Sequence, residues 1–301
     1  MNHFVSIRTA VLIVGLFVMV GPIKAEQQKY VTSLSSARGT IVDAKTYPWS
    51  SVAKLNNGVG GSCSAVLISH EYALTAAHCL FYKNTGRFLP AQSLHLILGY
   101  ENHRFDGHLL VSAYYISSAY EPTKPFESLA DDWALLSVSP QQKLTAPPLK
   151  ISAMIGATET HLMTAGYSHD TPYSMTADRH CHLVGRSPDR GLLYDSCAAP
   201  AGYSGAPVLA LSADGRTVSV AGIHVANQLW HGETVAVAVP IETIWKNIRH
   251  CVEGNQCEYQ VVAAGKDPTA AEVLSDLPNL GYRRQFELTG SSVPCSRESG
   301  C

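Results

Sequence analysis

The sequence predicts an all-β protein, either a barrel or a sandwich, that ends in a helix. Short apolar segments recur along the chain, and Gly, Pro and Asn turns separate them. One segment near the C-terminal end has the apolar spacing of a helix instead. About 275 residues follow an N-terminal export signal, which is enough for one large domain or two small ones.

The first 25 residues have the pattern of a signal peptide. Arg8 precedes an apolar run at residues 11–20, and Ala25 is a small residue at a suitable cleavage point. The run has about ten apolar residues, whereas a bilayer span needs roughly twenty. We therefore expect a secreted or periplasmic protein with no membrane span after signal cleavage.

Residues 26–40 are polar and aperiodic, which predicts a linker or a short pro-segment before the domain begins at residue 41. The strands predicted within the domain are short apolar runs bounded by turn residues. They lie at residues 51–55, 64–68, 94–98, 109–113, 133–138, 208–211, 217–221 and 234–239.

The predicted helix follows Pro240. Ile241, Ile244, Trp245 and Ile248 recur at i, i+3, i+4 and i+7, which places them on one helical face. We expect the domain to end near residue 255. The sequence indicates no role for the C-terminal tail at residues 256–301.

The chain has eight cysteines, an even number that is typical of a compartment in which disulfides persist. Their close spacing suggests four pairs, namely Cys63 with Cys79, Cys181 with Cys197, Cys251 with Cys257, and Cys295 with Cys301. The alternative is a metal site, supported mainly by His180, Cys181 and His182. The paired Cys-x-x-Cys and His-Glu-x-x-His spacings of such sites are missing, so we expect no metal.

The net charge of -2, without a block of Lys or Arg, gives no electrostatic footprint for nucleic acid. The sequence has no Gly-rich phosphate loop and no dinucleotide fingerprint, so we expect no cofactor. Any chemistry therefore belongs to side chains.

Ser204 is the candidate nucleophile, because it stands between Gly202 and Gly205 just before an apolar strand. A serine needs a base, a group that orients the base, and donors for an oxyanion. Gly202 lacks a Cβ, so its NH can turn toward developing negative charge beside the NH of Ser204. The alternative is that this segment is only a turn before a strand.

Two further segments supply a candidate base and acid. His78 lies among small residues next to Cys79, and Asp132 lies directly before an apolar strand, where a buried carboxylate needs a partner. Considered alone, His78 is more often a core histidine and Asp132 more often a turn residue.

Together, three motifs resemble those of the chymotrypsin-like, or trypsin-like, serine peptidases. Residues 75–79 read Thr-Ala-Ala-His-Cys, residues 132–136 read Asp-Trp-Ala-Leu-Leu, and residues 202–207 read Gly-Tyr-Ser-Gly-Ala-Pro. They occur in the family's order of His, Asp and Ser. The resemblance covers roughly residues 41–252.

The resemblance implies two antiparallel β-barrels packed face to face, with protein or peptide substrate bound between them. His78 and Asp132 would come from the first barrel and Ser204 from the second. His78 would act as general base, Asp132 would orient it, and the NH groups of Gly202 and Ser204 would form the oxyanion hole. Asp131 is the adjacent rival for the acid.

The departures from the family pattern also carry information. Tyr203 stands where digestive members have an Asp that binds the amino terminus freed on zymogen activation. We therefore do not expect this chain to be activated in that way. Ala198 stands where trypsin-like members have an acidic residue at the base of the specificity pocket. We therefore do not expect cleavage after Lys or Arg.

The resemblance is closer to the bacterial glutamyl-endopeptidase branch, through residues 42–49 and the Gly-Ile-His of residues 222–224. It implies that His224 contacts an acidic side chain before the scissile bond. The alternative is that His224 only packs within a strand. Val225, Ala226 and Asn227 would pair with substrate backbone, and Asn227, where glycine is usual, would narrow the pocket.

Two other functions compete with this one. An α/β-hydrolase esterase requires Gly-x-Ser-x-Gly and the order Ser, acid, His, whereas Ala206 stands at the last motif position here. A catalytically silent secreted binding protein on the peptidase fold is the other candidate, supported by Tyr203 and the tail. The sequence does not indicate an oligomeric state.

Overall fold

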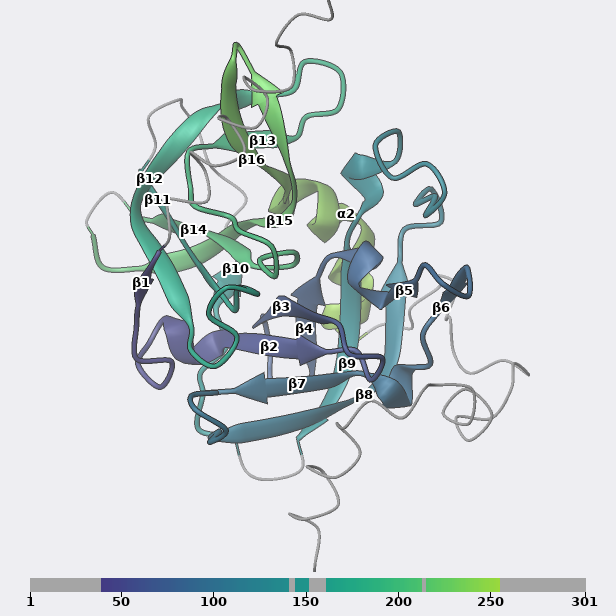
Figure 1. Cartoon of the computed structure of the whole chain (residues 1–301), viewed down its shortest axis with the longest axis vertical. Helices are drawn as coiled ribbons and strands as arrows, with labels where there is room; N and C mark the ends of the chain where they lie inside the picture. The colour runs from purple at the N-terminus through teal and green to yellow at the C-terminus, as the bar shows by residue number, and fades with distance from the viewer. Residues whose placement is uncertain (1–38, 141–143, 152–160, 213–214, 255–301) are drawn as a thin grey trace, which may run out of the picture.

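The computed structural model describes residues 39–140, 144–151, 161–212 and 215–254. The predicted signal, nearly all of the predicted linker, and the tail lie outside these residues. The described chain is built mostly of strands arranged in two antiparallel barrels, which confirms the predicted fold class (Figure 1). Among the described residues, no helix has the length and apolar character needed to cross a membrane.

The first barrel is a closed sheet in the order β2-β3-β4-β9-β8-β7, in the lower half of Figure 1. Its strands are β2 (Val52–Asn56), β3 (Ser62–Leu67), β4 (Tyr72–Thr75), β7 (His95–Leu98), β8 (Gly107–Ile116) and β9 (Ala134–Pro140). The sheet closes because β2 pairs with β3 on one side and with β7 on the other. A closed barrel has no exposed strand edge to protect.

The second barrel lies above the first in Figure 1 and runs in the order β12-β11-β14-β15-β16-β13. Its strands are β11 (His161–Gly166), β12 (Thr176–Arg186), β13 (Leu193–Asp195), β14 (Pro207–Leu211), β15 (Val218–Trp230) and β16 (Glu233–Pro240). The short strand β13 closes it by pairing with both β16 and β12.

Smaller elements complete the two barrels. The strand β1 (Thr40–Ile41) adds to β12, and β10 (Lys150–Ile151) runs parallel to the start of β15. The strands β5 (Phe81–Tyr82) and β6 (Arg87–Phe88) form a separate hairpin. The described residues also include four short 3-10 helices, namely η1 (Trp49–Ser51), η2 (Ala77–Leu80), η3 (Ala91–Ser93) and η4 (Leu129–Asp131).

The helix α2 (Ile241–Val252) follows β16 directly, as predicted, and packs against β15 and β16. Its buried face consists of Ile241, Ile244, Ile248 and Cys251, so the predicted apolar stripe faces the core. Pro240 precedes the first turn, where a proline does not interrupt helical hydrogen bonds.

The predicted strands lie within a few residues of observed ones, but the barrel strands β4, β11, β12 and β13 were not among those predicted. In β12 the residues Arg179 and His180 are exposed side by side, which interrupts the apolar alternation. Its core-facing residues Cys181 and Leu183 are buried by tertiary pairing with β11 and β13. Local composition therefore does not identify this strand.

One apolar cluster contains residues from both barrels, including Leu55 and Leu74 from the first and Tyr167 and Val239 from the second. A smaller cluster, which includes Leu162 and Val208, lies within the second barrel. Because the larger core is shared, the two barrels hold a fixed relative position, as a site built from both of them requires.

Candidate active site

His78 and Asp132 are brought together by the pairing of β4 with β9. His78 lies in η2, just after β4, and Asp132 follows η4, just before β9. The strands pair antiparallel with Thr75 opposite Ala134. The chain therefore leaves β4 and enters β9 at the same end of the sheet, where these two side chains meet.

Both carboxylate oxygens of Asp132 contact His78. Oδ2 lies 2.6 Å from the ring nitrogen Nδ1, and Oδ1 accepts the backbone NH of His78 at 2.8 Å. The Asp132 side chain is 2% exposed, whereas the His78 side chain is 30% exposed. The carboxylate is thus buried behind the ring. Nε2 is the ring nitrogen of His78 that remains available to exchange a proton with a substrate or a nucleophile.

Asp131, the rival acid, has a different partner. Its Oδ1 accepts a hydrogen bond from Ser117 Oγ at 2.6 Å. The carboxylate that contacts His78 is therefore that of Asp132.

The loop that carries Ser204 is held to the first barrel by Ser64 of β3. The Ser64 NH donates to the Ser204 carbonyl at 2.8 Å, and its hydroxyl donates to the Gly202 carbonyl at 3.0 Å. The same hydroxyl accepts the NH of Tyr167 at 3.0 Å. Ser64 is fully buried, and its role is not visible in the sequence because its partners lie more than 100 positions away.

Gly205 fixes how closely this loop approaches the segment that bears His78. Its φ is +79°, and a Cβ there would lie 2.2 Å from both Ser64 O and Thr75 Oγ1. The Ser204 carbonyl oxygen lies 3.7 Å from Sγ of Cys79, the residue after His78. Ser204 therefore lies beside the segment that carries His78. Among the described residues no hydrogen bond joins the two side chains, and such contacts commonly tighten only when substrate binds.

Gly202 must also be glycine. Its φ is +99°, and a Cβ would lie 2.3 Å from the Tyr167 carbonyl. Between it and Ser204, the side chain of Tyr203 is buried and its hydroxyl lies 2.8 Å from Thr176 Oγ1. Burial raises the pKa of Tyr203 above its ordinary value, so the phenol stays neutral as an anchor for the loop.

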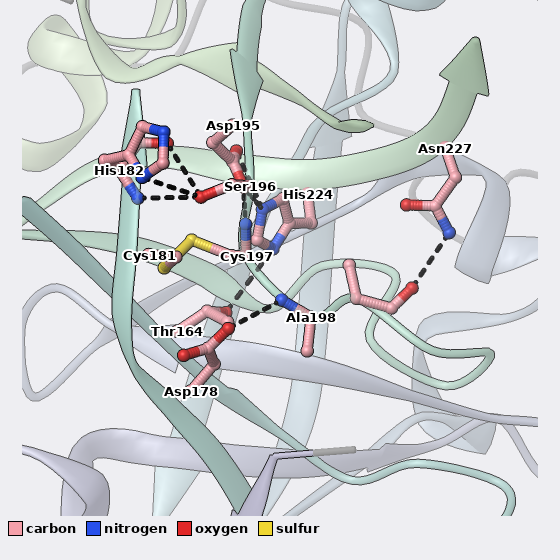
Figure 2. A network of polar contacts seen from close by, with 11 residues as sticks. Thr164, Asp178, Cys181, His182, Asp195, Ser196, Cys197, Ala198, His224 and Asn227 are labelled. Carbon is pink, nitrogen blue, oxygen red and sulfur yellow. Dashed lines mark hydrogen bonds and ion pairs between the residues drawn. A yellow bond between two sulfur atoms is a disulfide. The ribbon is translucent and has the colours of Figure 1, made fainter. Parts of the chain in front are cut away.

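His224 lies in a second network, inside the second barrel (Figure 2). Its Nε2 lies 3.1 Å from Oδ2 of Asp195, and its Nδ1 lies 3.4 Å from Thr164 Oγ1. The His224 side chain is 2% exposed and that of Asp195 is 0% exposed. Both ring nitrogens therefore have protein partners away from solvent. The roles of Asp195 and Thr164 are not visible in the sequence, because strand pairing alone brings them to His224.

The backbone of His224 holds the other side of the Ser204 loop. Its carbonyl accepts the NH of Gly205 at 2.8 Å, and its NH donates to the Ala206 carbonyl at 2.9 Å. The loop is consequently clamped between Ser64 of the first barrel and His224 of the second.

The segment between β13 and Ser204 is fixed by two carboxylates. Asp195 accepts the NH of Cys197, and Asp178 accepts the NH of Ala198, each at 3.0 Å. Further along, the Ala199 carbonyl accepts a hydrogen bond from Asn227 Nδ2 at 2.9 Å (Figure 2). This bond joins the segment to β15.

Two predicted disulfides are confirmed, Cys63 with Cys79 and Cys181 with Cys197. Cys257, Cys295 and Cys301 lie outside the described residues, so the other two pairs remain predictions. Cysteine and histidine come together at Cys63, His78 and Cys79, and again at Asp195, Cys197 and His224. In both groups the sulfurs are in disulfides and therefore offer no thiolate to a metal.

Comparison with known proteins agrees with this geometry. A family model described as a trypsin-like peptidase domain matches residues 63–220, more than half of the chain. A solved structure of a Glu endopeptidase in complex with MPD is similar, with 20% sequence identity and a TM-score of 0.57. The similarity covers 69% of this chain and 94% of that chain. At this identity it shows a shared fold and does not transfer a substrate. No curated protein matches.

Proposed function

The chain belongs to the trypsin-like peptidase family, and on that basis we propose that it is a secreted serine endopeptidase that works through His78, Asp132 and Ser204. The observation that carries the proposal is the contact of a partly exposed His78 with a sealed Asp132 carboxylate, beside the loop that bears Ser204. Serine-type chemistry needs this combination of orienting acid, accessible base and nearby hydroxyl.

In the proposed reaction, Ser204 Oγ attacks the peptide carbonyl carbon while Nε2 of His78 takes its proton. The tetrahedral intermediate collapses to an acyl-enzyme as His78 gives that proton to the leaving amine. Water then repeats the two steps and releases the carboxylic acid product. Asp132 holds Nδ1 and stabilises the imidazolium formed in each step.

The oxyanion is proposed to bind the backbone NH groups of Gly202 and Ser204. Among the described residues neither NH has a hydrogen-bond partner, which supports this role. The positive φ of Gly202 sets the direction of its peptide plane, and the anchored Tyr203 keeps the loop in place.

The substrate preference follows from the residues around Ser204. Ala198 offers no charge to a Lys or Arg side chain, which supports cleavage elsewhere. The expected preference for an acidic residue depends on His224 contacting substrate. Because the ring of His224 is buried and engaged by Asp195 and Thr164, the structure argues against that contact, and the preference remains a prediction.

Export is proposed from the predicted signal at residues 1–25, which lie outside the described residues. The two disulfides support it, because disulfides persist in oxidising compartments such as the periplasm or the extracellular medium.

The test is labelling of the purified protein with a fluorophosphonate probe, followed by peptide mapping of the adduct. It is done with residues 26–40 present and removed, because a pro-segment there would block the site. We expect an adduct on Ser204 that is absent in Ser204→Ala and retained in Ser112→Ala, an exposed serine of β8. Folded, processed protein that takes no label would instead favour the catalytically silent binding protein.

A further inference from the structure

Gly202 lies between two peptide groups, and the direction of the first one decides where its NH points. That NH belongs to the peptide between Ala201 and Gly202. In a planar trans peptide the NH and the C=O point in opposite directions, so a contact that fixes the Ala201 carbonyl also fixes the Gly202 NH. Glycine tolerates φ angles of either sign, so this peptide needs an outside contact to keep one direction.

His169 supplies that contact. Its backbone NH donates to the Ala201 carbonyl at 2.8 Å, which turns the Gly202 NH away from His169. On the other side of Gly202, the Gly202 carbonyl accepts the Ser64 hydroxyl at 3.0 Å. Both peptide planes of Gly202 are therefore held through their carbonyls, one by His169 and the other by Ser64.

The side chain of His169 ties it to the first barrel. Its Nε2 lies 3.0 Å from the Ser62 carbonyl in β3, and a carbonyl only accepts, so Nε2 carries the proton that is donated. The ring also lies close to Gly202, since a Cβ at Gly202 would come within 3.0 Å of His169 Cδ2. His169 thus links the peptide that carries the Gly202 NH to a strand of the other barrel.

The loop that contains His169, at residues 167–175 between β11 and β12, is also anchored on the first barrel. Nζ of Lys54 in β2, a residue only 6% exposed, donates to the Pro172 carbonyl at 2.7 Å. The same Nζ lies 4.7 Å from the centre of the Tyr100 ring, where a cation is favoured. Both ends of the contact between His169 and Ser62 therefore rest on fixed parts of the fold.

We infer that His169 is a positioning residue, which keeps the Gly202 NH directed into the oxyanion hole. Its backbone NH holds the Ala201 carbonyl, and its side-chain bond to Ser62 holds that backbone NH in place. When the side-chain bond is lost, the peptide is less restrained and can turn its carbonyl, a partial negative charge, toward the developing oxyanion. The inference rests on the proposed peptidase function and adds a residue outside the three motifs to that same site.

The test measures kcat and KM separately in His169→Ala, with the active concentration titrated by the fluorophosphonate probe and one peptide that the wild-type protein cleaves. Loss of an oxyanion donor costs about 10²–10³ in kcat, so a loosened donor should lower kcat at least about 10-fold. KM should change less than about threefold, because the contact strengthens only in the transition state. A peptide aldehyde, whose hemiacetal oxygen occupies the same hole, should lose affinity in proportion to kcat/KM.

Two further variants show which property of the His169 side chain matters. His169→Gln restores an NH donor for the Ser62 carbonyl, so its kcat should lie within about threefold of the wild-type value. His169→Met keeps a long side chain without a donor and should lose activity as His169→Ala does, which also decides the matter if the alanine variant does not fold.

The matched control is His161→Ala. His161 makes the same kind of contact, from Nε2 to the Arg179 carbonyl at 2.8 Å, but it lies at the opposite end of β11 from the 167–175 loop. This variant should leave kcat, KM and the affinity for the aldehyde unchanged.

The outcomes separate the inference from the proposed function. If wild-type Ser204 takes no fluorophosphonate label, the proposed function fails and the inference fails with it. If Ser204 is labelled but His169→Ala and His169→Met keep the wild-type kcat, the peptidase stands and His169 has no positioning role. A rise in KM with kcat unchanged would place His169 against the substrate and would overturn the inference in the same way. A kcat in His169→Gln as low as in His169→Ala would show that the bond to Ser62 is not what matters.

Discussion

Two histidine–aspartate pairs in the described part of the chain differ in what surrounds them. His78 and Asp132 lie in the first barrel, where the ring is partly exposed. His224 and Asp195 lie inside the second barrel, where both side chains are buried. Each pair has a disulfide beside it, at Cys79 and at Cys197 respectively. The local chemistry is similar, so the environment must decide the role of each pair.

The partner of the second ring nitrogen makes the difference. In the buried pair, Thr164 Oγ1 lies 3.4 Å from Nδ1 of His224, which completes a hydroxyl, imidazole and carboxylate set. Thr164 is fully buried, so no substrate reaches its hydroxyl. The three groups of a triad are therefore not sufficient, and access from solvent to the hydroxyl and to one ring nitrogen is also required.

From this difference we expect that substitutions in the exposed pair lower activity, whereas substitutions in the buried pair lower stability. Removing one partner of the buried pair leaves the other partner in the interior without its hydrogen bond. In the exposed pair, by contrast, water can replace part of a hydrogen bond that His78 loses, so the loss of stability should be smaller.

The largest effect is expected for Asp132→Asn. An amide cannot hold the correct tautomer of His78, so kcat should fall by about 10⁴-fold, measured with the best peptide substrate. The matched control is Asp131→Asn, because the Asp131 carboxylate accepts a hydrogen bond from Ser117 rather than contacting His78; this variant should keep most of the activity. A small loss in Asp132→Asn together with a large loss in Asp131→Asn would reverse the assignment of the acid.

Next in size is the loss of stability in Asp195→Ala. It leaves the buried ring of His224 without its hydrogen-bond partner, so the free energy of unfolding should fall by about 1–3 kcal/mol in urea titrations. Asp170→Ala, which removes an exposed carboxylate from the same half of the molecule, should change it by less than about 0.5 kcal/mol. An Asp195→Ala protein as stable as the wild type would show that this buried contact does not stabilise the fold.

The smallest effect concerns a third histidine contact, which joins two imidazole rings. Nδ1 of His95 lies 2.9 Å from Nε2 of His108 on the neighbouring strand. Burial lowers the pKa of both side chains, and His108 lowers that of His95 further. Each is thus harder to protonate in the folded protein than in the unfolded chain, where the pKa is about 6.5.

The stability from this third contact should be present above pH 6.5 or so and should be lost as the pH falls through the lower folded-state values. Replacing both residues by Gln should flatten the decline in unfolding free energy between pH 7.5 and 5, as followed by urea titration at each pH. The difference should stay below about 1 kcal/mol, because both groups are partly exposed to solvent. An identical decline in the double variant would exclude the pair as its source.

Much of the fold was predictable because its signals are local. Short apolar runs bounded by turn residues marked most of the strands, and the spacing of Ile241, Ile244 and Ile248 marked the helix. The two disulfides were also predictable, since Cys63 and Cys79 and the pair Cys181 and Cys197 are each separated by 16 positions. The strands β11 to β13 were missed because their burial depends on distant partners.

For the candidate site, the sequence predicts the residues of the three motifs but not how they are arranged. The order and type of His78, Asp132 and Ser204 are written in the chain, but the choice between Asp131 and Asp132 is not. That choice is made where η4 ends at Asp131 and turns the next carboxylate toward His78.

The sequence by itself thus determined the fold class, the disulfide pairing near the site and the candidate reactive groups, because each depends on residues close together in the chain. Only the tertiary structure decided how Ser64 holds the Ser204 loop, how Asp195 contacts His224, and how Asn227 reaches Ala199. These contacts join residues 28 to 138 positions apart. Strand register and barrel packing create them, and a one-residue shift in register would turn the same side chains to the opposite face.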